Sequence, residues 1–295
     1  MEPAAKALVA AGTAVGAALG ATLLRNQGTK ECLDKIDDAF PGSLTNQELV
    51  TRVYDKLLDF GFTKQNTILC TSLCGDEPTQ GLEKELERVY YPRRRRRMRK
   101  RKYNSDCETY HWGGLAGFPW GGVTAFASFA SQIPSDGQAL VVFAPHVGVD
   151  AAGHVGTVPH NKTSSGMPCC EAAVAASHHV VATYTQLGES LAGVASSDVK
   201  DAQHVALCDA LMPYAERLDQ SEEPMVELPY ALYDAQKEMI TQMIQEGCGA
   251  IPKNSKVAVL GGIQINTPPG TTDYFIPLSF DMFNSKGEDL EDLTL

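Results

Sequence analysis

Apolar residues recur at helical spacing along several stretches of the chain. Between Thr45 and Gly61 they occupy one face, and Thr45 with Glu48 forms a capping box, which predicts where this helix begins. A glycine just past the last apolar position is typical of a helix end, so Gly61 predicts its C-terminus. Further helices are predicted at 79–90, 201–218 and 224–246.

Uninterrupted apolar runs predict buried β-strands. They span 67–73, 139–144, 256–265 and 274–283. Strands separated by helices indicate an α/β fold, a layered sheet with flanking helices. Ligands in such folds collect beyond the carboxyl ends of the strands. Cys74 and His146 both follow a predicted strand directly, which draws attention to their chemistry.

The pattern also divides the chain into regions. Residues 1–43 form an N-terminal segment, of which 26–43 is a polar linker, and residues 44–284 form one domain. A basic insertion at 92–103 interrupts this domain, and an acidic tail at 285–295 follows it. Residues 111–122 hold five glycines, one proline and three aromatic residues, which predicts an irregular loop that approaches a ligand closely.

Three separated stretches carry residues of the kind that bind zinc. They contain Cys74, His146 and the neighbouring pair Cys169 and Cys170. Two thiolates and one imidazole leave a fourth tetrahedral position for water, which is the pattern of a catalytic zinc site. Asp76 lies two residues after the first ligand, within reach of that position.

Each of these residues has a simpler interpretation. A free cysteine such as Cys74 is often a small buried hydrophobic residue, and His146 could be a loop histidine satisfied by hydrogen bonds. Cys169 and Cys170 could form a vicinal redox pair. The residue pattern alone leaves these alternatives open.

The charge balance narrows the classes of partner. The chain of 295 residues has a net charge of -11, yet nine of its 25 basic residues lie in 93–102. The acidic remainder argues against broad nucleic-acid binding, and we expect no specific nucleic-acid partner. The basic run is interpreted as a solvated insertion, with a nuclear signal, an RNA contact or an anionic-membrane contact as alternatives. Eight cysteines without framework spacing favour a reducing compartment.

Residues 7–24 are uncharged and rich in alanine, with Gly12, Gly16 and Gly20 spaced by four. Their length lies near the lower limit for a membrane-spanning helix, and the glycine spacing suits close helix packing. A targeting segment and a helix packed on the body are the alternatives. A membrane contact through 7–24 therefore stays open.

From Thr45 to Phe283 the chain resembles the limiting CO2-inducible protein B/C family, theta-class carbonic anhydrases whose fold is similar to that of beta-class anhydrases. The matching stretches are TSLCGDE (71–77), HWGGLAGFPWGG (111–122), LVVFAPHVGVD (140–150), PCCEAA (168–173), PMVELPYALYDA (224–235) and LGGIQINTP (260–268). The resemblance implies that Cys74, His146 and Cys170 bind zinc, with Cys169 as the alternative to Cys170. It also implies that Asp76 is the catalytic aspartate.

The activity implied is reversible hydration of CO2 to bicarbonate, with zinc hydroxide as the nucleophile. Gly114, Phe118 and Trp120 are expected to line the substrate pocket, although each ring could serve packing alone. His111 is a candidate proton shuttle to bulk water.

One position departs from the family. Its members usually carry an arginine four residues after the aspartate, where this chain has Gln80. Glutamine can donate a hydrogen bond to Asp76 but supplies no positive charge. Asp76 is then freer to move onto the zinc as a fourth ligand, so we expect a slower enzyme or one closed at low pH.

Three functions are therefore weighed. The first is a carbonic anhydrase, and the second is a zinc-bound but weakly active partner subunit of a CO2-concentrating complex. The third is a thiol redox protein using Cys169 and Cys170. The resemblance implies a homodimer, or a hetero-oligomer with a paralogue, in the chloroplast stroma. A membrane-associated or cytoplasmic location is the alternative.

Overall fold

The computed structural model of the chain describes residues 30–76, 79–91, 109–159, 166–187 and 201–295. The strands are β1 (Leu44–Thr45), β2 (Thr67–Leu73), β3 (Thr109–His111), β4 (Gln138–Ala144), β5 (His146–Gly148), β6 (Thr157–Pro159), β7 (Gly166–Pro168), β8 (Val257–Asn266), β9 (Tyr274–Phe283) and β10 (Asp289–Asp292). The helices are α2 (Asn46–Leu58), α3 (Gln80–Tyr90), α4 (Gly122–Ala130), α5 (Glu171–Leu187), α6 (Ala202–Leu211), α7 (Ala215–Asp219) and α8 (Pro224–Gly247), with a further helix at 30–39.

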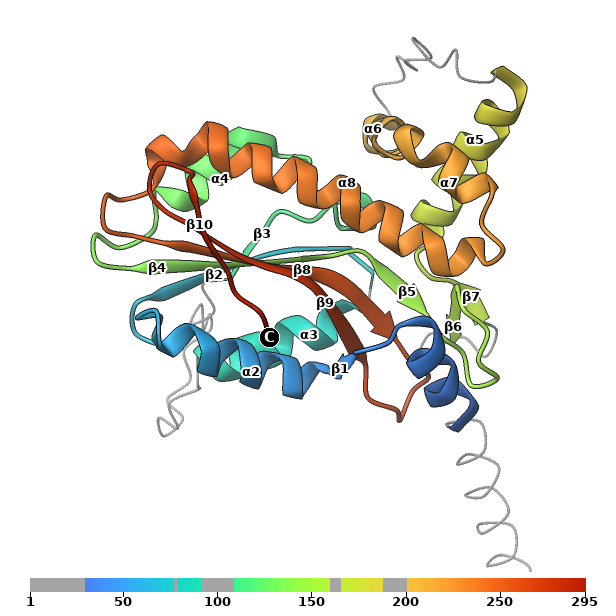
Figure 1. Cartoon of the computed structure of the whole chain (residues 1–295), viewed down its shortest axis with the longest axis horizontal. Coiled ribbons are helices and arrows are strands. Elements are labelled where there is room, and N and C mark those ends of the chain that lie inside the picture. The colour runs from blue at the N-terminus through green and yellow to red at the C-terminus, as the bar shows by residue number, and fades with distance from the viewer. Residues whose placement is uncertain (1–29, 77–78, 92–108, 160–165, 188–200) are drawn as a thin grey trace, which may run out of the picture.

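The centre of the molecule is an eight-stranded sheet in the order β1-β9-β8-β4-β2-β3, with β10 beside β9 and β5 beside β8. Strands β3, β2, β4 and β8 run parallel, while β9 is antiparallel to β8. A separate ribbon pairs β6 with β7. The predicted α/β class is confirmed, because helices flank this mixed sheet (Figure 1).

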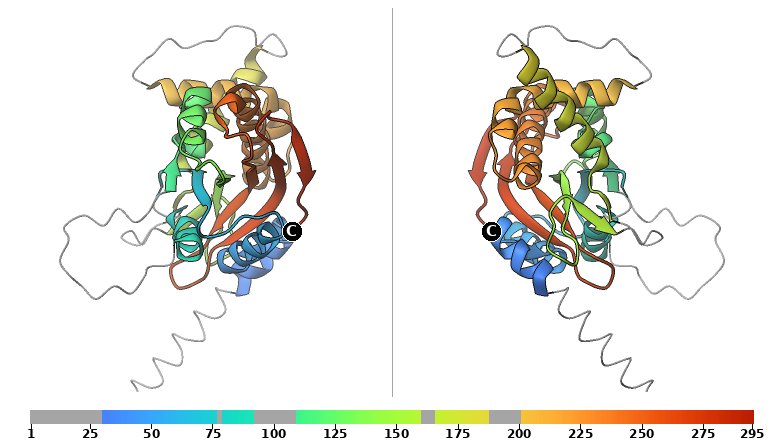
Figure 2. Two further views of the ribbon diagram at one scale, coloured as in Figure 1. Left: turned by 90° about the vertical axis from the view of Figure 1, so that its left-hand side faces the viewer. Right: turned by 90° about the vertical axis from the view of Figure 1, so that its right-hand side faces the viewer.

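Helices cover both faces of the sheet. Helices α2 and α3 lie on one face and α4 and α8 on the other, as the side views show (Figure 2). Every residue of β2 and β8 is consequently buried. Strands buried on both faces lose the alternation of polar and apolar residues, which is why they appear in the sequence as continuous apolar runs.

Local sequence signals place several element ends correctly. Thr45 caps α2, and both reciprocal hydrogen bonds with Glu48 are present.

The prediction of one continuous helix over 201–218 is wrong in one respect, since this stretch breaks into α6, a short 3-10 turn and α7. Pro213 lies at the break, where it lacks the N–H group that a continuous helix requires.

The segment 26–43 is not a polar linker throughout, as the sequence suggested. Residues 30–39 form a helix, and Cys32, Ile36 and Phe40 are fully buried in the same core cluster as the central strands. Phe40 stacks on Tyr230 of α8 with ring centroids 6.1 Å apart. These three buried residues recur at intervals of four among charged neighbours, so the apolar stripe is only one residue wide.

The C-terminal acidic segment also differs from a simple tail. Asp289–Asp292 forms β10 and pairs antiparallel with β9. Leu293 just after it is fully buried. The side chains of β10 are exposed, and carboxylates on an exposed edge strand discourage pairing with other chains.

In the part of the chain that the structure describes, no helix has the length and hydropathy that a membrane crossing requires. Residues 7–24 and the basic run 93–102 lie outside the described residues. The interpretations of both segments therefore stay predictions.

We predict that Phe40→Ala lowers the free energy of unfolding by about 3–5 kcal/mol, because the fully buried ring leaves a cavity against α8. Urea unfolding followed by circular dichroism measures the change. Leu58→Ala is the control, since Leu58 is 43% exposed and its loss should cost no more than about 0.5 kcal/mol. Equal effects of the two substitutions would show that the helix at 30–39 does not belong to the core.

Candidate metal centre

Two neighbouring parallel strands end side by side and deliver the first two site residues. Leu73 at the end of β2 pairs in register with Ala144 at the end of β4. Cys74 follows the first strand and His146 begins β5 just after the second. Pairing in register therefore brings together two side chains that lie 72 residues apart in sequence.

The third stretch arrives from the ribbon at the same end of the sheet. Strand β7 leads directly into Cys169 and Cys170. Backbone hydrogen bonds hold this stretch against the strand that carries His146. The Gly148 N–H donates to Cys169 O at 3.3 Å, and the Cys169 N–H donates to Gly156 O at 2.9 Å.

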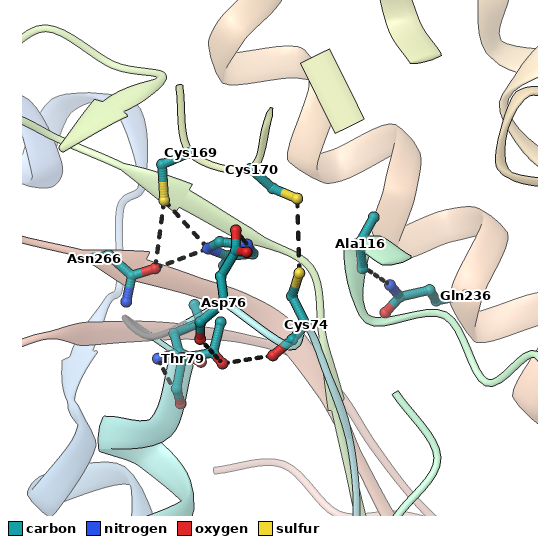
Figure 3. A network of polar contacts seen from close by, with 10 residues as sticks. Cys74, Asp76, Thr79, Ala116, Cys169, Cys170, Gln236 and Asn266 are labelled. Atoms are coloured by element: carbon teal, nitrogen blue, oxygen red, sulfur yellow. Dashed lines mark hydrogen bonds and ion pairs between the residues drawn. The ribbon is translucent and has the colours of Figure 1, made fainter. Parts of the chain in front are cut away.

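Four side chains from these stretches converge on one point (Figure 3). One donor atom from each of Cys74, Asp76, His146 and Cys170 lies within 4.8 Å of all the others. The two sulfur atoms are 3.7 Å apart, and Asp76 Oδ2 lies 3.3 Å from His146 Nε2. Three of the four residues are buried, which is the setting of a specific cation site rather than of a surface cluster.

Cys169 faces a different atom of the histidine. Its Sγ lies 3.2 Å from His146 Nδ1, which also lies 3.0 Å from Asn266 Oδ1. Cys170 is the member of the pair that lies beside Cys74. The geometry therefore separates the two neighbouring cysteines, with Cys170 inside the donor group and Cys169 behind the imidazole ring.

The two clustered thiols share their proton unequally. The hydrogen bond from Cys170 lowers the pKa of Cys74 to about 5, with burial opposing and His146 assisting this shift. The pKa of Cys170 rises, because that thiol donates to Cys74 and is itself buried. Both shifts favour the thiolate form of Cys74, which is the form of cysteine that binds metals.

The surroundings of His146 attract positive charge. Burial lowers the pKa of the imidazole, but the charge of Cys169 and the hydrogen bonds with Asp76, Cys169 and Cys170 raise it well above its usual value. His146 Nε2 is buried, with Asp76 Oδ2 3.3 Å away as the neighbouring acceptor. A metal cation at this atom would satisfy both conditions, and sulfur with imidazole is the donor set that zinc prefers.

The turn that carries Asp76 is fixed by Thr79. The Thr79 hydroxyl group lies 2.7 Å from Cys74 O and 2.8 Å from Asp76 O, and the Thr79 N–H donates to Asp76 O at 3.2 Å. Helix α3 begins at the next residue. Nothing in the sequence pattern singled out Thr79, because a threonine before a helix is an ordinary capping signal.

Gln80 is not directed at Asp76 in this structure. It is the exposed first residue of α3, and its Oε1 accepts a hydrogen bond from Lys84 at 3.4 Å. The expected donation from Gln80 to Asp76 is therefore not made here, and the Asp76 side chain is 43% exposed.

An apolar wall lies beside the sulfur atoms. Phe118 is fully buried and stacks on Trp120 with centroids 4.8 Å apart. Both rings belong to the hydrophobic cluster that also contains Cys74 and Cys170. Gly114 is required beneath Trp120, because a Cβ there would come within 2.5 Å of the indole ring. The three predicted pocket residues thus lie together, and the two rings belong to the cluster that contains Cys74 and Cys170.

A left-handed turn joins this wall to the first cysteine. Ala116 has φ 54° and Gly117 has φ 82°, and a Cβ on Gly117 would lie 3.2 Å from Cys74 N. Two buried side chains secure the turn. Ser72 donates to Gly117 O at 2.7 Å, and Gln236 of α8 donates to Ala116 O at 2.7 Å. Gln236 directly follows a stretch matching the family, which is the one sequence signal that could have found it.

His111 lies outside the donor group. Its Nδ1 is 2.9 Å from Glu83 and 3.3 Å from the Thr71 hydroxyl group, on edge strand β3. Thr71 precedes Cys74 by three positions on β2. The structure therefore pairs His111 with a carboxylate on α3, and its role as a proton shuttle stays a prediction.

Comparisons with known proteins identify the family of the chain. The sequence profile of the limiting CO2-inducible proteins B/C, beta carbonic anhydrases, matches residues 43–284. Comparison with curated proteins returns no significant match.

Among solved structures, PtLCIB4, a homolog of the limiting CO2-inducible protein LCIB, is 38% identical with a TM-score of 0.78, covering 89% of this chain and 100% of that chain. The structure of a histidine-to-alanine mutant of PtLCIB4 gives a TM-score of 0.79 at 38% identity, and the match covers 90% of this chain and 99% of the mutant chain. LCIB itself is 21% identical with a TM-score of 0.62, covering 87% and 97%, which supports the fold alone.

The profile match spans most of the chain. The matched region includes all four residues of the donor group. The chain therefore belongs to the family of limiting CO2-inducible proteins B/C, beta carbonic anhydrases.

Proposed function

We propose that this protein is a zinc-dependent carbonic anhydrase, which catalyses the reversible hydration of CO2 to bicarbonate. The observation that carries the proposal is the group of Cys74, Asp76, His146 and Cys170 donor atoms within 4.8 Å of one another, in which all but Asp76 are buried. The family description, which names beta carbonic anhydrases, supports the reaction class.

Cys74, His146 Nε2 and Cys170 would hold the zinc ion, with Asp76 beside it. A bound zinc ion supplies Lewis acidity, lowering the pKa of coordinated water from 15.7 toward about 7. The protein contributes the burial of the site, which strengthens electrostatic interactions within it.

Asp76 is the residue that handles protons and orientation in this proposal. Its ionised carboxylate only accepts hydrogen bonds, so it can hold a hydroxyl group with the proton directed toward itself. The Thr79 hydroxyl group donates to Asp76 O at 2.8 Å and so fixes the backbone at Asp76. The rings of Phe118 and Trp120 provide an apolar surface that suits CO2, which carries no net charge and no hydrogen-bond donor.

A second candidate is a zinc-bound but weakly active subunit of a CO2-concentrating complex. The placement of Asp76 supports it, because its Oδ2 already lies 3.3 Å from the Nε2 atom that would bind the metal. A carboxylate so near can become a fourth ligand and exclude water. Gln80 is paired with Lys84 and provides no charge to hold Asp76 away.

A thiol redox role for Cys169 and Cys170 is less well supported. Cys170 lies beside Cys74, while Cys169 lies beside His146 and Asn266. Assembly as a homodimer, or with a paralogue, and a chloroplast location are proposals carried by the family resemblance.

We predict that Cys74→Ala removes zinc and reduces CO2 hydration to the uncatalysed background, because one of two thiolate ligands is lost. Stopped-flow hydration assays and metal analysis of the purified protein measure both effects. Cys248→Ala is the matched control, since this thiol lies outside the donor group and should keep full activity. Native protein that carries zinc but hydrates no CO2 would favour the weakly active subunit.

The neighbouring cysteines should differ in metal binding. Cys170→Ser should leave the purified protein without stoichiometric zinc, because Cys170 is the sulfur beside Cys74. Cys169→Ser should retain zinc, because Cys169 lies behind the imidazole at Nδ1. Metal content by mass spectrometry distinguishes them, and the reverse result would exchange the two assignments.

Gln80→Arg should increase CO2 hydration by up to about fivefold, the value of one partly exposed ion pair of about 1 kcal/mol. The guanidinium group would pair with Asp76 and hold the carboxylate away from the metal. Gln80→Glu is the control and should decrease the rate, because its charge has the opposite sign. Identical rates for the two variants in stopped-flow assays would exclude a role for charge at position 80.

A further inference from the structure

His146 has acceptors on both sides of its ring, so its tautomer must be selected. In one tautomer, Nδ1–H donates to Asn266 Oδ1 at 3.0 Å and the Nε2 lone pair is free for a metal. In the other, Nε2–H donates to Asp76 at 3.3 Å and Nδ1 accepts from the Cys169 thiol at 3.2 Å. Only the first tautomer can bind zinc at Nε2.

The orientation of the Asn266 amide decides between them. With Oδ1 toward the ring, Asn266 accepts from Nδ1–H and favours the first tautomer. With the amide reversed, its NH2 group would donate to Nδ1 and favour the second. Asn266 is buried at the end of β8, so water does not settle the choice.

Asp273 fixes that orientation. Its carboxylate lies beside the residues at the end of β8: the Thr267 N–H donates to Asp273 Oδ1 at 2.9 Å, and hydrogen bonding with the neighbouring Asn266 side chain opposes the rise that burial causes in the pKa of Asp273. An ionised carboxylate is only an acceptor, so the amide must present its NH2 group to Asp273 and its oxygen to His146. The negative charge of Asp273 thus determines which group donates and which accepts in the contacts from Asp273 through Asn266 to His146.

We propose that Asp273 and Asn266 form a relay that positions His146, selecting the tautomer whose Nε2 is available to the metal. The relay rests on the metal site proposed above and adds two positioning residues to it.

Asp273 is itself held in place from several directions. The Thr267 N–H donates to Asp273 Oδ1 at 2.9 Å, and the Asn46 N–H donates to Asp273 O at 3.1 Å. Burial raises the pKa of Asp273, and the hydrogen bonds from Thr267 and Asn266 oppose that rise. Its orientation is thus determined independently of the metal.

The same carboxylate also contacts the helix that follows Asp76. A Cβ on Gly81, the second residue of α3, would lie 3.1 Å from Asp273 Oδ2. A carboxylate near a helix N-terminus is stabilised by the helix dipole, which helps to keep Asp273 ionised. Asp273 therefore lies between the end of β8, where Asn266 is located, and the N-terminus of α3, the helix that follows Asp76.

The test is zinc affinity of the full chain, measured by competition with a chelating dye and without CO2. Asp273→Asn preserves shape but removes the charge that orients Asn266, and we expect zinc affinity to fall about 10- to 100-fold, the usual effect of losing an outer partner of a metal ligand. The exchange variant Asn266→Asp with Asp273→Asn should restore tight binding, because the carboxylate then accepts directly from Nδ1–H and the new amide can donate to it. Asn254→Ala, at an exposed asparagine, is the control.

A second measurement separates tautomer selection from a general loss of structure. Nitrogen-15 NMR of the metal-free protein, recorded at a pH above the titration of His146 so that the imidazole is neutral, should show the proton on Nδ1 in the native chain and a shift toward Nε2 in Asp273→Asn. Native affinity together with an unchanged tautomer in Asp273→Asn would overturn the relay, as would failure of the exchange variant to recover binding. A relay-dependent zinc affinity in a protein that hydrates no CO2 would leave the relay standing and reject the proposed function instead.

Discussion

The in-register pairing of β2 with β4 is the constraint on which the rest of the site depends. Leu73 opposite Ala144 brings the ends of both strands to the same level, so Cys74 and His146 emerge side by side. A shift of one residue would direct alternate side chains to the other face of the sheet. Because β2 and β4 are packed between two helical layers, that register is strongly determined by core packing.

This pairing also creates an electrostatic problem that the fold must solve. Sulfur, imidazole and carboxylate groups lie close together, and Cys74, His146 and Cys170 are buried. Buried charges are costly unless they are paired or bind a cation. The depressed pKa of Cys74 and the raised pKa of His146 are two expressions of the same demand for positive charge. In the proposed function a zinc ion would meet that demand, and the metal would then be a part of the local structure as well as of the chemistry.

Sequence patterns predicted the central layer well because burial there leaves a direct signature. The limits of β2 and β9 match the apolar runs, and Thr45 with Glu48 caps α2 as expected. The helix at 30–39 was missed because its buried stripe is one residue wide, and β10 was missed because its side chains are exposed. The spacing of residues within a short segment does not show whether that segment packs against elements far away in the sequence, as the helix at 30–39 and β10 do.

In the site, too, some residues could be predicted from the sequence, while others depend on how distant elements pack. Ligand types and strand ends located Cys74 and His146, but no pattern could distinguish Cys169 from Cys170, because the choice depends on how β7 approaches the sheet. Asn266 is the last residue of a buried strand, one position past the strand predicted at 256–265, and no sequence pattern marked it as functional. Its role follows only from three-dimensional contacts with partners 120 and 7 positions away.

Asn266 presents a neutral amide, not a carboxylate, to His146, which is consistent with the negative charge already present around the imidazole ring. Two sulfurs and Asp76 surround the Nε2 side of the ring, and Cys169 adds a third sulfur at Nδ1. A carboxylate in direct contact with Nδ1 would add another negative charge at the most buried point of the cluster. Placing Asp273 one residue further out transmits its orienting effect through Asn266 while keeping its charge near the helix terminus at Gly81. The amide of Asn266 orients His146, while the negative charge of Asp273 stays outside the cluster. In the proposed site, a divalent cation is then bound without additional repulsion among its ligands.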